Sequence, residues 1–276
     1  MTQTIDLAEA DRVLKARHRA MWALGDYPAV AGEIINTLGP VLVQAAGIRR
    51  GQRVLDVAAG TGNAAIPAAL TGAEVVASDL TPELLAAGQE DATGRGADLE
   101  WRTADAEALP FADATFDTTV SCVGVMFAPH HQVAADELVR VTRPGGTIAL
   151  INWTPEGFIG QLFATMKPFA PPPPPGAQPP PLWGDPDHVR GLLGGRVTEL
   201  TLTRRVLHVD HFGTAEEFRD YFSTTYGPTI VAYQAIREDP DRLAALDAAL
   251  IDLARRNDAG NGALDWEYLL VTARRR

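Results

Sequence analysis

Apolar runs alternate with amphipathic stretches through the first 155 residues of the chain. Five short apolar runs have the length and composition of buried strands, at residues 53–58, 74–78, 99–103, 116–125 and 147–153. The stretches between them predict helices at residues 63–70 and 132–141, and a third helix that opens at Thr81 and Pro82. Strands separated by helices imply right-handed crossovers, so this pattern predicts a mostly parallel sheet with helices on both faces.

Two further helices are expected before the first strand. Residues 6–24 place apolar side chains among charged ones at helical spacing, namely Leu7, Val13, Leu14, Met21 and Leu24. Pro28 ends this helix, because the residue before a proline avoids the helical region. Residues 29–46 then predict a second helix that ends near Gly47.

The pattern changes after Trp153. Residues 168–186 hold ten of the twenty prolines, which predicts an extended polyproline segment, either a stiff spacer or a lid over a binding site. Residues 197–209 alternate like a strand, and residues 264–273 predict a final strand. Thr214 and Glu217 form a capping box for a helix over 214–222, and residues 241–256 are helical.

Composition and charge narrow the class of protein. The chain has 276 residues and a formal charge of −11, so it lacks the basic footprint that nucleic acid requires. Its single cysteine, Cys122, cannot form an internal disulfide, which fits a reducing cytoplasm. No apolar run approaches the ~20 residues of a membrane-spanning helix, and the N-terminus has no apolar signal-peptide core. We therefore expect a cytoplasmic monomer or homodimer with no nucleic-acid partner and no membrane insertion.

A glycine-rich turn joins the first strand to the helix that follows it. Gly60 and Gly62 allow positive φ and close approach of a ligand, and the helix N-terminus behind them presents free N–H groups to an anion. Asp79 follows Gly60 by 19 residues at the end of the next strand, where a carboxylate can accept both ribose hydroxyls of an adenosine-type ligand. Spacing alone leaves NAD open as that ligand, because Gly60 and Ala65 satisfy the looser dinucleotide pattern.

Five stretches, in order and spacing, resemble the class I S-adenosylmethionine (SAM)-dependent methyltransferases. The nearest resemblance is to the small-molecule branch that includes the ubiquinone and menaquinone C-methyltransferases. The stretches are VLDVAAGTG (54–62), ASDLTPELL (77–85), DAEALPF (105–111), FDTTV (116–120) and ELVRVTRPGG (137–146). The resemblance covers about residues 20–155, and the five stretches taken together are specific for this family. It implies a Rossmann-like α/β fold with seven mostly parallel strands, the seventh antiparallel, and SAM as cofactor with S-adenosylhomocysteine as product.

The resemblance also implies a role for each matching residue. Four residues would surround the methionine moiety of SAM: Asp56, Ala58, Gly60 and Gly62. Asp79 would hold the ribose, and Leu80 would pack on the adenine. Asp105 and Ala106 would meet the adenine edge, with the Asp105 carboxylate accepting from the exocyclic amine. Cys122 would line the site after the fourth strand.

The chain departs from many family members at the glycine turn. They carry Glu or Asp-x-Gly-x-Gly there, whereas residues 58–62 of this chain are AAGTG and the acidic residue is Asp56, inside the strand. This departure leaves open which group contacts the amino group of the methionine moiety. In this family the N-terminal segment often folds over SAM, so we expect Tyr27, and with it Trp22, to close the site by cation–π attraction, with plain core packing as the alternative.

Histidines are the candidates for a general base. His130 and His131 follow the fourth strand on the substrate side of the crevice, and histidine titrates near neutral pH. The alternative is that one of them merely caps the helix that follows. His208 and His211 have no third ligand nearby in the sequence, so no metal is expected. Cys122 has no Cys-His signature and is expected to be a small buried hydrophobe rather than a nucleophile.

The chain is expected to divide into four segments. A helical segment (1–50) covers the cofactor site, a SAM-binding Rossmann-like core follows (51–155), and the final strand of the core closes the chain (263–276). Residues 156–262 form substrate-binding lid insertions after strands 5 and 6, including the proline-rich segment and the sixth strand. Aromatic residues concentrate in these insertions, which favours a pocket for an apolar or aromatic small molecule, although they also fit the core of a helical lid.

The sequence therefore predicts a SAM-dependent methyltransferase that acts on a small, apolar or aromatic acceptor by in-line transfer, as in secondary metabolism. A non-catalytic SAM-binding protein is an alternative, because binding motifs do not prove turnover. An NAD-dependent oxidoreductase is less favoured, because no Tyr-x-x-x-Lys spacing follows the nucleotide motif. A protein or tRNA methyltransferase is a further option, although the acidic charge disfavours RNA. The methylated atom, oxygen, nitrogen or carbon, is left open.

Overall fold

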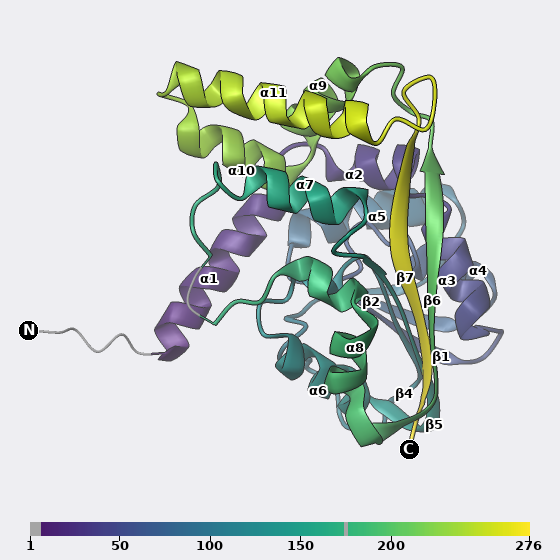
Figure 1. The fold of residues 1–276 in the computed structure, drawn as a ribbon. Helices are drawn as coiled ribbons and strands as arrows, with labels where there is room; N and C mark the ends of the chain where they lie inside the picture. Colours follow the sequence, from purple (N-terminus) through teal and green to yellow (C-terminus); the bar gives the residue numbers. More distant parts are fainter. Residues whose placement is uncertain (1–6, 174–175) are drawn as a thin grey trace, which may run out of the picture.

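The computed structural model describes residues 7–173 and 176–276, which form a seven-stranded sheet with helices on both faces (Figure 1). The order of the strands across the sheet is β3-β2-β1-β4-β5-β7-β6. The strands are β1 (Arg53–Val57), β2 (Glu74–Asp79), β3 (Glu100–Thr103), β4 (Phe116–Cys122), β5 (Thr142–Trp153), β6 (Val197–Val209) and β7 (Leu264–Arg275). The expected α/β fold with seven mostly parallel strands is confirmed.

The parallel part of the sheet is built around β1. This strand pairs in parallel with β2 and β4, β2 pairs with β3, and β4 pairs with β5. The last strand, β7, runs antiparallel between β5 and β6. Because parallel strands end at the same edge of a sheet, the loops after β1, β2, β3 and β4 meet at one end of the molecule.

Two strand ends differ by more than two residues from the expected apolar runs. β5 begins at Thr142 rather than Thr147, because the extra residues between these positions are taken up by an irregularity opposite Phe116 in β4. β4 ends at Cys122 rather than at residue 125, because Val123 takes a positive φ of 55° and turns the chain into a 3₁₀ helix, η2 (Val125–Phe127).

Helices lie against both faces of the sheet and above one end of it. They are α1 (Leu7–Trp22), α2 (Tyr27–Ala29), α3 (Leu38–Ala46), α4 (Ala65–Leu70), α5 (Pro82–Gly94), α6 (His131–Val141), α7 (Phe158–Met166), α8 (Pro186–Leu193), α9 (Ala215–Thr225), α10 (Gly227–Ile236) and α11 (Pro240–Arg256). Figure 1 shows α3 and α4 on one side of the sheet and α6 and α8 on the other. The helices α7, α9, α10 and α11 form a layer over one end of the sheet (Figure 1).

The expected single helix over residues 29–46 is broken into pieces. α2 runs into a π-helix, η1 (Val30–Ile34), and α3 begins only at Leu38. The break falls just before Pro40, which has no N–H to donate and whose ring conflicts with the carbonyl four residues earlier. Within residues 7–173 and 176–276, no single helix is long and apolar enough to cross a membrane. Among the described residues, only the helix pair Tyr27–Ile34 and Leu38–Ala46 is long and apolar enough when its two parts are taken together, and these parts are bent by 69° relative to each other.

The proline-rich segment is only partly extended. It includes a 3₁₀ helix, η3 (Pro180–Gly184), which carries the fully buried Trp183. Prolines are tolerated there because the first residues of a helix donate no hydrogen bond within it. The Gln178 N–H donates to the Pro129 carbonyl at 3.0 Å, so the segment packs against the turn before α6. Residues 174–175 of this segment lie outside the described residues.

The upper helical layer is held by caps and by aromatic packing. As expected, Thr214 accepts a hydrogen bond from the Glu217 N–H at 3.1 Å, while the Glu217 carboxylate accepts from the Gly213 N–H at 2.7 Å. Phe158 of α7 stacks on Trp266 of β7 with ring centroids 5.8 Å apart, which ties this layer to the sheet. Many of the aromatic residues in the insertions therefore form a helical core.

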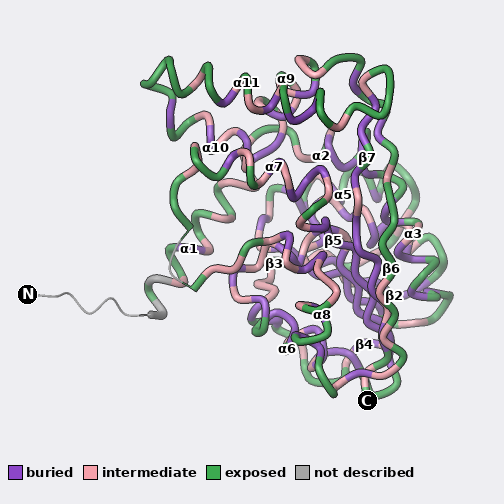
Figure 2. Tube along the Cα trace, viewed as in Figure 1, coloured by how far each residue is buried: buried purple, intermediate pink, exposed green. Residues whose placement is uncertain are grey.

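Burial follows the sheet closely. Figure 2 shows buried residues along the central strands and exposed residues along the outer surface of α11. β6, which the sequence groups with the lid insertions, is the edge strand of the sheet, and most of its residues are partly or fully exposed.

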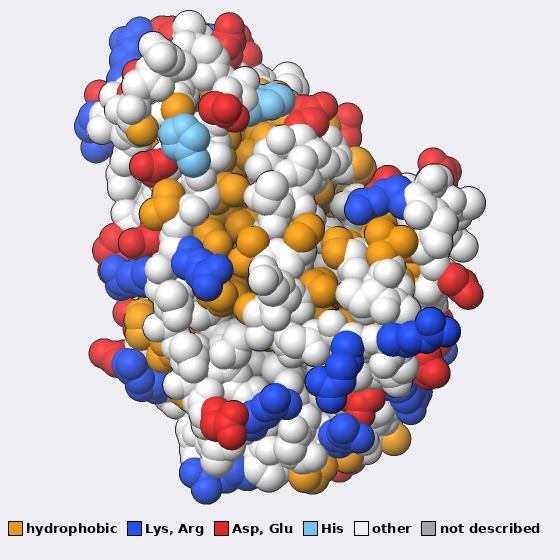
Figure 3. Space-filling model, turned by 90° about the vertical axis from the view of Figure 1, so that its right-hand side faces the viewer, with side chains coloured by type: hydrophobic (Ala, Val, Ile, Leu, Met, Phe, Trp, Pro, Cys, Tyr) orange, Lys and Arg blue, Asp and Glu red, His pale blue; other side chains and the backbone are white. Residues whose placement is uncertain are grey.

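Basic side chains gather on the lower part of the face in Figure 3, below a hollow lined by hydrophobic side chains. Elsewhere among the described residues arginines pair with carboxylates, for example Arg143 at 2.7 Å from Asp117 and Arg196 at 2.5 Å from Asp136.

Candidate active site

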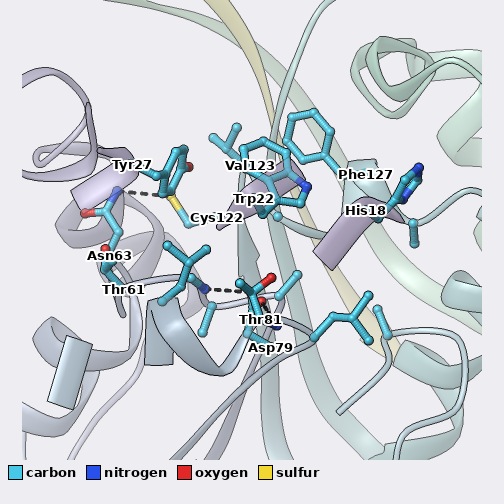
Figure 4. Close-up of a pocket in the computed structure, with 18 of the residues that line it drawn as sticks. His18, Trp22, Tyr27, Thr61, Asn63, Asp79, Thr81, Cys122, Val123 and Phe127 are labelled. Atoms are coloured by element: carbon cyan, nitrogen blue, oxygen red, sulfur yellow. Dashed lines mark hydrogen bonds between the residues drawn. The ribbon is translucent and has the colours of Figure 1, made fainter. Parts of the chain in front are cut away.

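A cavity of about 840 Å³ lies at the carboxyl ends of β1, β2 and β4, where α1 and the residues after it form one wall. Eight of the ten residues expected to bind the cofactor line this cavity, namely Tyr27, Ala58, Gly60, Asp79, Leu80, Asp105, Ala106 and Cys122. The other two, Asp56 and Gly62, do not line it. Figure 4 shows Tyr27, Asn63 and Cys122 at one end of the cavity, His18 at the other, and Trp22 between them.

The glycine turn has the backbone geometry that the sequence indicates. Gly60 has a φ of 56° and Gly62 a φ of 85°. At Gly62 the missing side chain makes room for a neighbour, since an added Cβ would lie 2.7 Å from the Trp101 ring. Gly62 therefore serves packing, whereas Gly60 exposes its backbone to the cavity. The helix behind the turn, α4, begins at Ala65 and has only six residues.

Ala58 also has a left-handed backbone, with a φ of 53°. An alanine in this region is strained by roughly 1–2 kcal/mol relative to the right-handed region. Replacing Ala58 by glycine relieves this strain, offset in part by the greater freedom of glycine in the unfolded chain. We expect Ala58→Gly to raise the free energy of unfolding by about 0.5–1 kcal/mol in urea titrations.

The neighbouring Ala59 supplies a matched control for this prediction. Ala59 is not among the residues with positive φ, so Ala59→Gly should lower the free energy of unfolding. Equal destabilisation by the two substitutions would contradict the proposed strain at Ala58.

Asp79 lies at the end of β2 with 8% of its surface exposed. Its Oδ2 accepts a hydrogen bond from the Gly60 N–H at 2.8 Å, and its Oδ1 accepts from the Thr81 N–H at 2.8 Å (Figure 4). Burial raises the pKa of Asp79, and these N–H groups offset the increase in part. Each oxygen keeps a lone pair for a ligand hydroxyl, so Asp79 is oriented to bind a diol.

Asp56 is more deeply buried, with 1% of its surface exposed and no hydrogen bond to either carboxylate oxygen. Burial raises the pKa of Asp56 to about 8. The nearby Ala65 backbone N–H lowers this pKa in part, and the negative charge of Asp79 raises it further. Asp56 is therefore largely protonated at neutral pH and lies behind the cavity wall rather than in it.

Lys15 of α1 connects the N-terminal helix to the far end of the cavity. Its ammonium lies 2.6 Å from Asp105, 2.9 Å from Asp11 and 3.0 Å from Glu107. Burial alone would lower the pKa of Lys15, but its hydrogen bonds to these carboxylates raise it. His130 adds a contact between its Nδ1 and Glu107 at 2.9 Å. The cluster thus fixes α1 over the loop after β3.

Three of these groups have the spacing of metal ligands. Ligand atoms of Asp11, Glu107 and His130 lie within 4.8 Å of one another. The Lys15 ammonium lies 2.9 Å from Asp11 and 3.0 Å from Glu107, so it already provides the positive charge. We therefore assign this cluster to positioning α1.

The two histidines considered as general bases lie outside the cavity lining. The His130 backbone N–H and Nδ1 both contact Glu107, which holds the ring at the turn before α6. His131 is fully buried, with its Nδ1 2.9 Å from His188 Nε2. Burial lowers the pKa of His131 to about 3, with a further contribution from the nearby His188. Neither histidine is placed to take a proton from a ligand in the cavity.

The other sequence candidates have structural contacts. His208 pairs with Asp265 at 2.8 Å, and His211 lies 3.7 Å from Glu33 across the fold. Cys122 lines the cavity, where Asn63 contacts its sulfur at 3.8 Å. Burial raises the pKa of the Cys122 thiol, which agrees with a neutral small side chain.

Some cavity residues were not expected from the sequence. Lys15, His18 and Asn63 line the cavity, although no motif includes them. Lys15, His18 and Trp22 follow one another at helical spacing on α1, so one face of this helix forms the cavity wall. Burial lowers the pKa of His18, which keeps its imidazole neutral at pH 7.

A second cavity of about 310 Å³ adjoins the first. Four residues line both: Tyr27, Ile35, Val123 and Phe127. The remaining residues of its wall are Val30, Trp153, Ile159, Phe222, Tyr226 and Trp266. This wall is apolar and aromatic and holds no charged side chain from the described residues. The two cavities therefore meet at a wall that includes Tyr27.

Comparisons with known proteins agree with this arrangement. The family model described as "Methyltransferase domain" matches residues 55–150. The uncharacterized protein Rv1405c of Mycobacterium tuberculosis is 54% identical over 276 residues, or 99% of this chain and 100% of that protein. The demethylmenaquinone methyltransferase of Renibacterium salmoninarum is 40% identical over 114 residues, or 41% of this chain and 46% of that enzyme. The solved structure of geranyl diphosphate methyltransferase with SAM has a similar fold, with a TM-score of 0.54 and 17% identity over 87% of this chain and 85% of that chain.

Proposed function

Because this chain belongs to the class I SAM-dependent methyltransferases, we propose that it methylates a small, apolar or aromatic acceptor. The acceptor occupies the second cavity and reaches the cofactor past Tyr27. The observation that carries this proposal is the apolar, uncharged wall of the second cavity, which adjoins the cavity that suits SAM.

The first cavity provides groups that suit each part of SAM. We place the ribose at Asp79, whose carboxylate is buried and oriented by two backbone N–H groups. We place the methionine moiety beside the backbone of Gly60, which lines the cavity next to Tyr27. The adenine lies between Leu80 and the loop that carries Asp105 and Ala106. This placement leaves the aromatic end of the cavity for the sulfonium.

When bound, SAM supplies an electrophilic methyl group on a positively charged sulfur. Aromatic rings suit such a charge, and Trp22 packs edge to face against Tyr27 at 5.3 Å and against Phe127 at 4.6 Å. These rings also exclude water and orient two reactants against each other, which is the main contribution that a protein makes to methyl transfer. No carboxylate or imidazole of the described residues lines the second cavity. The site therefore suits an acceptor whose attacking atom needs no base from the protein.

The proposal is tested first by ligand binding and then by turnover. S-adenosylhomocysteine at 100 times its Kd should stabilise the protein by ~2.7 kcal/mol and raise its melting temperature by a few degrees, whereas NAD should not. Apolar aromatic compounds incubated with SAM should then gain one methyl group, detected by mass spectrometry. A melting shift with NAD alone would rule out the proposal, and SAM binding without any methylated product would favour a non-catalytic SAM-binding protein.

The ion cluster around Lys15 gives a prediction for cofactor affinity. In Lys15→Met the carboxylates of Asp11, Asp105 and Glu107 lose their shared cation, so α1 is held less firmly over the cavity. The Lys15 side chain is 17% exposed, and we expect its loss to weaken S-adenosylhomocysteine binding about tenfold by isothermal titration calorimetry.

The same helix offers a control for Lys15. Arg12 is 75% exposed and pairs with Glu9 on α1, so Arg12→Met should leave the affinity unchanged. If both variants bind S-adenosylhomocysteine like the wild type, α1 closure does not depend on the cluster.

A further inference from the structure

The loop between β4 and α6 forms part of the wall of both cavities. Val123 and Phe127 line both of them, and Pro129 lines the first. Near β4 the loop is tied to the sheet, since the Val123 N–H donates to the Ile151 carbonyl at 2.8 Å. Farther along, the N–H groups of Phe127 and Ala128 donate to carbonyls of the loop itself, each at 3.0 Å. The position of these two residues therefore depends on how the end of the loop is held.

The proline-rich segment holds that end. We call residues 176–188 the strap. The Gln178 N–H donates to the Pro129 carbonyl at 3.0 Å, and the Gln178 Oε1 accepts a hydrogen bond from the His131 N–H at 3.2 Å. One residue of the strap thus contacts both sides of the turn that leads from the loop into α6.

The second of these hydrogen bonds caps α6. The first N–H groups of a helix have no acceptor within the helix, and the side chain of His130, at the N-cap position, accepts no hydrogen bond from them. The His130 N–H donates to Glu107 at 2.6 Å, and the His131 N–H donates to Gln178, which is 47 residues away in the sequence. Because a capping oxygen stabilises the start of a helix, Gln178 also stabilises the end of the loop that precedes it.

The strap restricts the conformations of Gln178. Three prolines, at positions 179–181, follow it, and a residue before proline avoids the helical region. The fixed φ angles of these prolines leave the chain less freedom to lose when it becomes ordered. Beyond them, the Trp183 ring packs on His131 with ring centroids 5.6 Å apart, and His188 Nε2 lies 2.9 Å from His131 Nδ1. The strap therefore contacts the start of α6 through three of its residues.

We propose that Gln178 is a positioning residue for methyl transfer: its side-chain oxygen caps α6 from the strap, and this cap holds Phe127 and Pro129 in the wall of the cofactor cavity. His131 is fully buried, so without this oxygen its N–H would lack an acceptor in the folded protein. Such a loss favours conformations in which the end of the loop has moved. This assignment rests on the proposed function and gives the proline-rich segment the role of a brace for the cavity.

The test removes the acceptor oxygen and measures both the loop and the cofactor site. Gln178→Leu lacks the oxygen but has nearly the same size. Hydrogen–deuterium exchange of a peptide that covers residues 123–130 should become about fivefold faster, and the Kd of S-adenosylhomocysteine should rise about fivefold by isothermal titration calorimetry, the effect of one lost hydrogen bond. Gln178→Glu should match the wild type in both measurements, because its carboxylate keeps an acceptor and the N-terminus of a helix favours negative charge.

Gln132→Leu is the matched control. It removes the same type of side chain from α6, but the Gln132 amide contacts Asp136 and the Leu192 carbonyl instead of the loop. Both the exchange of residues 123–130 and the affinity for S-adenosylhomocysteine should equal those of the wild type.

Three results would overturn the assignment. The first is unchanged exchange of residues 123–130 in Gln178→Leu, and the second is faster exchange with an unchanged affinity for S-adenosylhomocysteine. The third is that Gln178→Glu or Gln132→Leu behaves like Gln178→Leu. Failure of the wild type to bind S-adenosylhomocysteine would instead count against the proposed function, and the exchange rates alone would then decide whether Gln178 holds the loop.

Discussion

Asp79→Ala is expected to raise the Kd of S-adenosylhomocysteine at least a hundredfold. The buried carboxylate is already oriented by the Gly60 and Thr81 N–H groups, so its remaining lone pairs are fixed toward the cavity. A hydrogen bond to a charged group contributes about 1.5–3 kcal/mol, and two ribose hydroxyls therefore account for about 3 kcal/mol or more. The substitution also leaves the two backbone donors without an acceptor, which loosens the glycine turn.

Isothermal titration calorimetry of the wild type and the variant measures this effect directly. Asp91→Ala, an exposed change on α5 at a residue that pairs with Arg95, is the control and should leave the Kd unchanged. Circular dichroism establishes that the Asp79 variant is folded before its affinity is compared. A Kd within threefold of the wild type would show that Asp79 does not hold the ribose.

The second large effect concerns Asp56 and pH. Its pKa is about 8 in the folded protein and about 3.9 in the unfolded chain, so the folded state favours the protonated form. Below pH 4 the Asp56 carboxyl is protonated in both the folded and the unfolded state, so it does not lower the free energy of unfolding. Between pH 4 and pH 8 only the unfolded state loses the proton, so the free energy of unfolding falls, by about 5 kcal/mol in total. Above pH 8 this contribution is constant.

Asp56→Asn should remove this pH dependence. The amide leaves buried groups unpaired, so the variant has a constant cost of about 1–3 kcal/mol at every pH. Relative to the wild type, the variant should nevertheless gain several kcal/mol of stability between pH 5 and pH 9, measured by urea unfolding. Asp187→Asn, at a side chain that is 92% exposed, should show no such trend. A constant difference between Asp56→Asn and the wild type across this range would show that Asp56 has an ordinary pKa.

The positions of the strands were the most predictable part of the fold. The apolar runs, each bounded by turn residues, predicted the ends of β1, β2 and β6 to within one residue. This is because the buried side chains of a strand form a short apolar or alternating pattern in the sequence. The segment over residues 29–46 was misjudged because its apolar spacing is helical while Pro40 interrupts the backbone hydrogen bonds. The 3₁₀ helix around Trp183 was missed because proline composition dominated the local pattern.

The candidate site was predictable where it lies directly after strands. Topology requires that the ends of β1 and β2 meet, so Gly60 and Asp79 could be placed from spacing alone. The contribution of α1 was not predictable in this way, because Lys15 reaches Asp105 across 90 residues of sequence and no local pattern encodes that contact. The position of His131 after β4 suggested that it lines the crevice, but its side chain is buried against His188. A position in the sequence therefore does not determine which way a side chain points.

The wall that the two cavities share limits which substitutions can change the acceptor without also changing the cofactor site. Substitution of Tyr27 or Phe127 alters both cavities. A substitution there that improves binding of a new acceptor is therefore expected to weaken binding of the cofactor. Ile159 of α7 and Phe222 of α9 line only the second cavity and belong to the helices above the sheet. Under the proposed function, sequence changes in these two helices alter the choice of acceptor while the cofactor cavity stays intact, which makes them targets for redesigning selectivity.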